Sequence, residues 1–189
     1  WKGHKFNLLD TPGYFDFVGE VKAALRVVET AILLVDAVAG IEVGAELTYE
    51  HALRAGVSRF IVVNKMDREN ANFQRTLSAL EEAWGRGVVP FQLPIGAEAS
   101  FSGVVDVVQQ KAYIFSGKQV KEEAVPAEFE GQVAEIREKL MELAAEADDE
   151  LTMKFLEEGE LSQEELERGL RLGVVKGDIV PVLVASAAK

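Results

Sequence analysis

The chain has 189 residues, a formal net charge of −12 and no cysteine. The lack of cysteine excludes a disulfide framework and a thiolate metal site, and the acidic balance argues against a general nucleic-acid-binding surface, so no DNA partner is expected. Hydrophobic residues make up 48% of the chain, enough for a sizeable core, but no apolar run is long enough to span a membrane.

The first expected element is a strand over residues 6–9, which leads into a turn at Asp10-Thr11-Pro12-Gly13. Pro12 removes a backbone donor and Gly13 removes side-chain bulk, so a terminal phosphate could approach the glycine amide closely. Asp10 could hold Mg²⁺ through water, because this ion tends to keep part of its hydration shell. By itself, Asp-x-x-Gly is also typical of a plain turn.

Hydrophobic spacing predicts alternating helices and strands in the next part of the chain. We expect helices over residues 18–28, 43–55 and 73–84, and strands over residues 31–36 and 60–63. Asp36, which closes the first of these strands, is expected to be a cap rather than part of a site. The alternation is typical of a parallel sheet with helices packed on its faces.

The second of these strands ends in Asn64-Lys65-Met66-Asp67, at the edge of the sheet where open α/β folds bind ligands. Asp67 can accept two parallel hydrogen bonds from the ring N–H and exocyclic amine of guanine. Asn64 can hold a purine nitrogen and tie neighbouring loops together, and the stem of Lys65 can lie along the base. The motif predicts GTP or GDP as ligand; the structural alternative is a strand-to-helix turn with Asp67 as N-cap.

The alternation of helices and strands stops near residue 92, and a different pattern of elements lasts to about residue 177. Short strands are expected over residues 104–108 and 112–115 and around Val120, with a hairpin turn at Gly117-Lys118, followed by helices over residues 127–147, 151–156 and 163–172. We therefore predict an inserted α+β subdomain at residues 92–177. Residues 1–91 and 178–189 would form the α/β domain.

Residues 179–187 are expected to form a further strand of the parallel sheet. Backbone amides that follow this strand, at Ser186 and Ala187, could donate to the keto oxygen of guanine. A backbone donor at this position would distinguish guanine from adenine.

The motifs together resemble a known family. Asp10-Thr11-Pro12-Gly13, Asn64-Lys65-Met66-Asp67 and Ser186-Ala187 stand in the order of three motifs of translational GTPases. The detail resembles elongation factor G, on the following residues: Asp16-Phe17 after the first motif, Leu93-Pro94-Ile95-Gly96, Phe101-Ser102-Gly103, Asp106 and Lys111-Ala112-Tyr113. The last four match the subdomain that elongation factor G inserts into its GTPase domain, and the resemblance covers nearly the whole chain.

The resemblance implies an α/β fold of the P-loop GTPase type, a mainly parallel sheet with helices on both faces, plus the inserted α+β subdomain. It also implies GTP or GDP with Mg²⁺ as cofactors and GTP hydrolysis coupled to translocation or a related ribosomal step. The partners would be the factor-binding site of the ribosome and, through the inserted subdomain, the ribosomal stalk proteins. A cytoplasmic monomer is expected.

Two departures from the family pattern matter. No Gly-x-x-x-x-Gly-Lys-[Ser/Thr] occurs in the chain, so the phosphate loop and first switch of the family would lie before Trp1. We expect this piece alone to bind GTP weakly or not at all, because backbone amides and a lysine normally neutralise the phosphates.

The second departure is Tyr14, at the position where elongation factors of this kind carry a histidine that positions the attacking water. A phenol, with a pKa of about 10, does not easily take a proton from water, although its hydroxyl can orient one. In having tyrosine at this position, the chain resembles elongation factor G-like paralogues. We therefore predict slow or absent GTP hydrolysis. His4 and His51 have no evident partner in the sequence and are expected to be structural or solvent-facing.

Other hypotheses remain. A binding module could act on stalk proteins through the inserted subdomain, with nucleotide irrelevant; the acidic helix over residues 127–147 motivates it, although such a face is usually just solvated. An adenine-using P-loop enzyme is disfavoured, since adenine lacks the paired donors that suit Asp67. A dinucleotide enzyme is disfavoured because no glycine-rich fingerprint follows a strand.

Overall fold

The computed structural model of the protein describes residues 2–117 and 119–188. These residues form two four-stranded sheets, with strand orders β1-β2-β8-β3 and β4-β5-β6-β7. The strands are β1 (Thr30–Asp36), β2 (Ser58–Asn64), β3 (Val88–Pro90), β4 (Gln92–Ile95), β5 (Gly103–Asp106), β6 (Lys111–Ser116), β7 (Gln119–Ala124) and β8 (Val180–Val184). The α-helices are α1 (Val18–Ala24), α2 (Val43–Arg54), α3 (Phe73–Trp84), α4 (Glu130–Glu146), α5 (Asp149–Glu158) and α6 (Gln163–Lys176).

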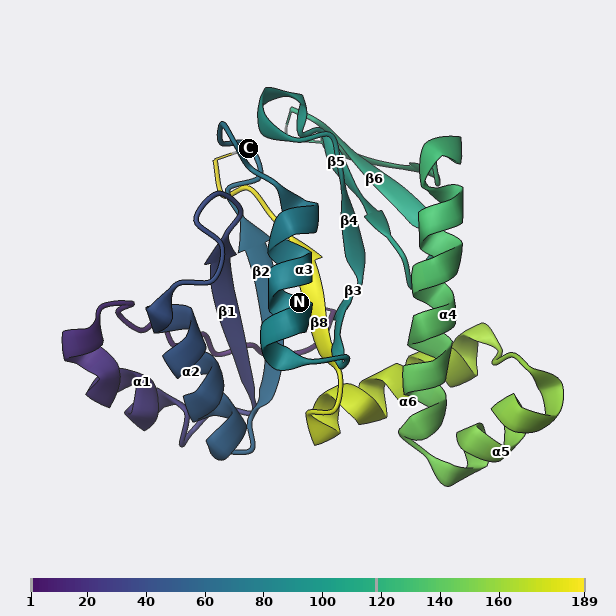
Figure 1. Ribbon diagram of the computed structural model, residues 1–189, viewed down its shortest axis with the longest axis horizontal. Coiled ribbons are helices and arrows are strands. Elements are labelled where there is room, and N and C mark those ends of the chain that lie inside the picture. The colour runs from purple at the N-terminus through teal and green to yellow at the C-terminus, as the bar shows by residue number, and fades with distance from the viewer. Residues whose placement is uncertain (1, 118, 189) are drawn as a thin grey trace.

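The first sheet is parallel throughout, and it confirms the predicted fold class. Asp36 at the end of β1 pairs with Asn64 at the end of β2, and Val63 of β2 pairs with Val184 at the end of β8. Because the strands run in one direction, their C-terminal ends meet at one edge. Figure 1 shows this edge at the top of the view, with α3 lying across one face of the sheet.

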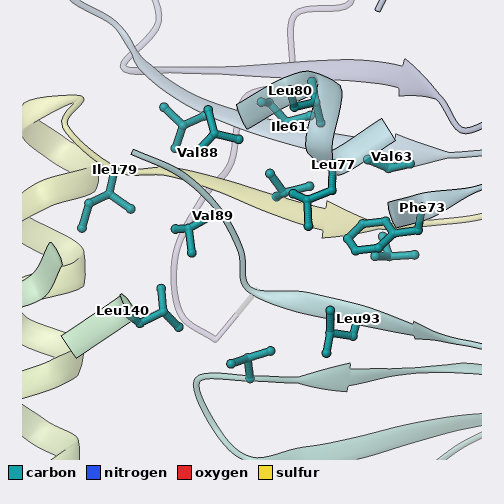
Figure 2. Packing of buried hydrophobic residues seen from close by; sticks show 14 of the residues in the cluster. Ile61, Val63, Phe73, Leu77, Leu80, Val88, Val89, Leu93, Leu140 and Ile179 are labelled. Carbon is teal, nitrogen blue, oxygen red and sulfur yellow. The ribbon is translucent and has the colours of Figure 1, made fainter. Parts of the chain in front are cut away.

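The core of the sheet lies under α3. Ile61 and Val63 of β2 are fully buried, and so is Leu80 of α3. Figure 2 shows these side chains beside Leu77, which is spaced one helical turn before Leu80. Alternate residues of a strand point to opposite faces, so Ile61 and Val63 face the helix together while Val62 lies on the other face.

The second sheet is antiparallel and is inserted in the chain between β3 and β8. β6 and β7 form the hairpin expected around Gly117, and Lys118 lies outside the described residues. β3 and β4, which carry Pro90 and Pro94, are not predicted from the sequence. Proline disfavours most strand positions, but β4 is an edge strand of its sheet, where proline is tolerated.

The inserted residues share their core with the parallel sheet. One cluster of buried side chains includes Val88 and Val89 of β3, Leu93 of β4, Leu140 of α4 and Ile179 before β8. Figure 2 shows Val88 on the α3 side of β3 and Val89 on the other side, toward Leu140. The boundaries at residues 92 and 177 stay a prediction, although β4 begins at Gln92 and α6 ends at Lys176.

Two predictions about the N-terminal part were wrong. Residues 6–9 form no strand, and Phe6, Leu8 and Leu9 are 64%, 84% and 55% exposed. A strand needs a partner, and among the described strands β1 pairs with β2 alone. The helix expected over residues 18–28 ends at Ala24. The other predicted helices and strands occur, with ends shifted by a few residues, and none of the described helices has the length and apolar character needed to cross a bilayer.

Candidate functional site

Loops from three parallel strands meet at the C-terminal edge of the first sheet. After β1, the amide of Ala37 donates to the carbonyl of Asn64 at 2.9 Å. After β8, the amide of Ala185 donates to the carbonyl of Val63 at 2.9 Å, and its own carbonyl accepts from the amide of Met66 at 3.3 Å. The segment after β2 is therefore held between its two neighbours. We call residues 64–72 the base loop.

The polar side chains of the base loop contact the segment after β8. The hydroxyl of Ser186 donates to Oδ1 of Asp67 at 2.5 Å. The amide of Ala187 donates to Oδ1 of Asn64 at 3.1 Å. Predicted site residues that lie far apart in the chain are thus brought together at one edge, and Asn64 ties the loops as predicted.

Lys65 has a partner that the sequence does not predict. Its Nζ lies 2.6 Å from Oδ2 of Asp36, at the end of β1. Lys65 also has a φ of +64°, a left-handed conformation that is uncommon for a residue with a side chain. Asp36 Oδ1 accepts from the amides of Val38 and Ala39, so it caps the turn after β1, whereas the N-cap of α2 is Glu42.

The surroundings of Asp36 lower the pKa of its carboxyl group. Burial pushes this pKa upward, but the hydrogen bonds from Lys65 and from the amides of Val38 and Ala39 outweigh burial and hold it below its ordinary value of 3.8. A carboxyl whose pKa is lower in the folded state adds stability above its unfolded pKa. That stability is lost as the pH falls through the folded pKa.

Asp36→Asn is therefore expected to lower the free energy of unfolding at pH 7 by about 0.5–1 kcal/mol, because the carboxamide keeps the cap but loses the ion pair. The difference from wild type should shrink as the pH falls through the lowered pKa of Asp36, and urea unfolding at pH 7 and at low pH measures both values. Glu50→Gln, which breaks the exposed Glu50–Arg54 pair, is the control and should change little. A difference that persists unchanged at low pH would contradict the ion-pair explanation.

Met66 anchors the base loop near its start, and Asn72 anchors it at its end. The side chain of Met66 is fully buried, so this residue anchors the loop in the core and only its backbone lies at the edge. Asn72 is the N-cap of α3, and its side chain accepts from the amide of Arg75 at 2.9 Å. The structural alternative with Asp67 as N-cap is therefore wrong.

Residues 10–14 are not part of this constellation. Asp10, Pro12, Gly13 and Tyr14 are exposed, on an irregular segment that leads into η1 (Phe15–Phe17) and α1, which lies beside α2 (Figure 1). Tyr14 is 79% exposed. Among the described residues, no three acidic or histidine side chains lie together as a metal site. His4 is exposed and His51 lies half-buried in the last turn of α2.

Comparisons with known proteins agree with this architecture. The family model of the elongation factor Tu GTP binding domain matches residues 1–189. A crystal structure of a protein from Thermus thermophilus is similar to this chain with a TM-score of 0.87 and 36% sequence identity. The match covers 95% of this chain and 27% of the Thermus chain. The chain therefore spans little more than a quarter of the length of that relative.

Proposed function

Because the chain belongs to the elongation factor Tu GTP-binding domain family, that of the translational GTPases, we propose that it is the base-reading part of an elongation factor G-like GTPase. The observation that carries the proposal is the pair of hydrogen bonds that join Asp67 to Ser186 and Asn64 to Ala187. These bonds gather a carboxylate, a carboxamide and a strand-end backbone at the edge where such folds bind ligands.

The chemistry of these groups fits guanine. Ser186 donates to one oxygen of Asp67, and a carboxylate has room for about four hydrogen bonds, so it can also accept the two parallel donors of guanine. Asn64 uses its oxygen to accept from Ala187, which leaves its NH₂ group to donate to a purine ring nitrogen. The Ala187 amide must exchange that partner in order to donate to the keto oxygen of the base.

The roles of the phosphate-side residues are also part of the proposal. Thr11, Pro12 and Gly13 would present backbone to the terminal phosphate. Asp10 would act on Mg²⁺ through water, because this ion tends to keep part of its hydration shell. Bound Mg²⁺ would supply charge neutralisation on the phosphates. Tyr14 would orient water through its hydroxyl.

For the protein that contains this chain, we propose action on the ribosome, with hydrolysis coupled to translocation or a related step, in the cytoplasm and as a monomer. A second candidate is a binding module that acts on stalk proteins through the inserted residues. It is favoured by Met153 and Leu156 of α5, which are 64% and 79% exposed among acidic residues. Single exposed apolar residues are common, so the GTPase remains the first proposal.

Equilibrium competition with labelled GDP tests the proposal, on the protein at its natural length. GDP and GTP are expected to compete with each other, and ADP at least about 100-fold more weakly, because a site built around paired hydrogen bonds rejects a base that cannot make them. Titration of the same protein with stalk proteins, with and without GDP, addresses the second candidate. Equal competition by ADP would contradict the guanine assignment.

A further inference from the structure

A short loop of the inserted residues touches the base loop directly. This loop, residues 96–101, contains the 3₁₀ turn η2 (Glu98–Ser100). The amide of Glu98 donates to the carbonyl of Met66 at 2.8 Å. The carboxylate of Glu98 accepts from the amide of Asn70 at 2.7 Å. One residue of the insert thus binds the base loop at two points, on either side of Asp67.

The contact is made in backbone conformations that are costly for residues with side chains. Glu98 has a φ of +55° and Asn70 a φ of +65°, both in the left-handed region. Such conformations persist where the surroundings determine them, and they concentrate at functional sites. Because the carboxylate of Glu98 binds the amide of Asn70, each of the two unusual conformations supports the other.

The loop that presents Glu98 is itself tightly built. Gly96 has a φ of +74°, and a Cβ at this position would lie 2.2 Å from the carbonyl oxygen of Ser100. The hydroxyl of Ser100 donates to the carbonyl of Ala97 at 2.6 Å. Only glycine fits at the start of the loop, and the side chain of Ser100 closes it, so Glu98 is held on a rigid support.

The peptide units around Met66 are consequently fixed from two directions. The amide of Met66 donates to Ala185, after β8, and its carbonyl accepts from Glu98. The next residue is Asp67, whose carboxylate is the proposed partner of guanine. A small rotation of the Met66–Asp67 peptide would move that carboxylate, and directional hydrogen bonds weaken steeply with misalignment.

We propose that Glu98 is a positioning residue for base recognition, through which the inserted residues set the affinity of the protein for guanine nucleotides. The inference rests on the proposed function. Glu98 acts on the base side of the site, so its loss changes GDP and GTP binding by the same factor. A residue that acted on the phosphates would discriminate between the two.

The test is Glu98→Ala in the protein at its natural length. We expect Kd for GDP and for GTP to rise together by about three- to tenfold, mainly through faster dissociation, because a charge-assisted hydrogen bond is lost. Glu98→Gln keeps an acceptor oxygen and should restore most of the affinity. Glu157→Ala removes an exposed carboxylate from α5 of the inserted residues and is the charge-matched control, with unchanged Kd.

Amide hydrogen exchange supplies a readout that needs no nucleotide. The amides of residues 66–72 should exchange faster in Glu98→Ala than in wild type, Glu98→Gln or Glu157→Ala. Gly96→Ala, which forces the loop apart without removing the carboxylate, should act in the same direction as Glu98→Ala.

The outcomes separate this inference from the proposed function. If wild type binds GDP and Glu98→Ala binds it equally well, the inference fails and the function stands. If Glu98→Ala weakens GTP but not GDP, the effect belongs to the phosphates and the inference fails. If wild type binds neither guanine nucleotide, the proposed function fails and the inference fails with it.

Discussion

Replacing Asp67 with asparagine is expected to move the preference of the protein from guanine toward xanthine nucleotides. The substitution replaces one acceptor oxygen by an NH₂ group, which faces the exocyclic amine of guanine, donor against donor. Xanthine carries an oxygen where guanine carries that amine, so the new NH₂ group can donate to it. We expect the affinity for GDP to fall about 100-fold or more and the affinity for the xanthine diphosphate to rise.

The structure indicates that this variant keeps its fold. The hydroxyl of Ser186 donates to Oδ1 of Asp67, and the carboxamide oxygen of asparagine can accept the same bond. Competition binding with GDP and the xanthine diphosphate, on the protein at its natural length, measures the change. Asp178→Asn is the matched control, since Asp178 is exposed and lies just before the opposite end of β8. An unchanged guanine preference would remove the role given to Asp67.

Replacing Tyr14 with histidine is expected to raise ribosome-stimulated GTP hydrolysis by about 100-fold, the lower end of what a positioned general acid or base contributes. An imidazole titrates near neutral pH, whereas a phenol holds its proton there. Tyr14 is 79% exposed, so the substitution disturbs no core contact. The measurement is turnover by the protein at its natural length, with and without ribosomes.

Tyr14→Phe separates the two roles that a tyrosine can have. It removes the hydroxyl and should slow hydrolysis further if that hydroxyl orients the water. GDP affinity should be the same in all three proteins, because Tyr14 lies in the bend just before η1 and not on the base loop. Equal, fast turnover by wild type and Tyr14→His would show that tyrosine does not limit the reaction.

The parallel sheet could be predicted because its signals are local. The apolar runs that became β1 and β2 are short and β-branched, and Phe73, Leu77 and Leu80 of α3 recur at helical spacing. The meeting of Asn64 and Asp67 with Ser186 and Ala187 followed from the rule that parallel strands end at one edge. The carboxamide of Asn64 and the carboxylate of Asp67 then narrowed the expected ligand to a base that offers paired donors.

Other features depend on partners that the sequence does not reveal. The apolar run at residues 6–9 looks like a strand, but it forms none, because a strand is defined by its neighbour. Pro90 and Pro94 hid β3 and β4, since the tolerance of proline depends on whether a strand lies at an edge. The Lys65–Asp36 and Glu98–Asn70 contacts join positions 29 and 28 residues apart, and neither pair forms a local motif.

The shared core limits where the chain could be cut or exchanged between relatives. Val88, Val89 and Leu93 lie on continuous chain that leaves one sheet at β3 and enters the other at β4, and Leu140 and Ile179 belong to the same buried cluster. A chimera joined at residues 92 and 177 would separate Leu93 and Leu140 from their partners and leave apolar surface on both halves. A graft that keeps β3, β4 and α4 together with Ile179 preserves those contacts and is the sounder design.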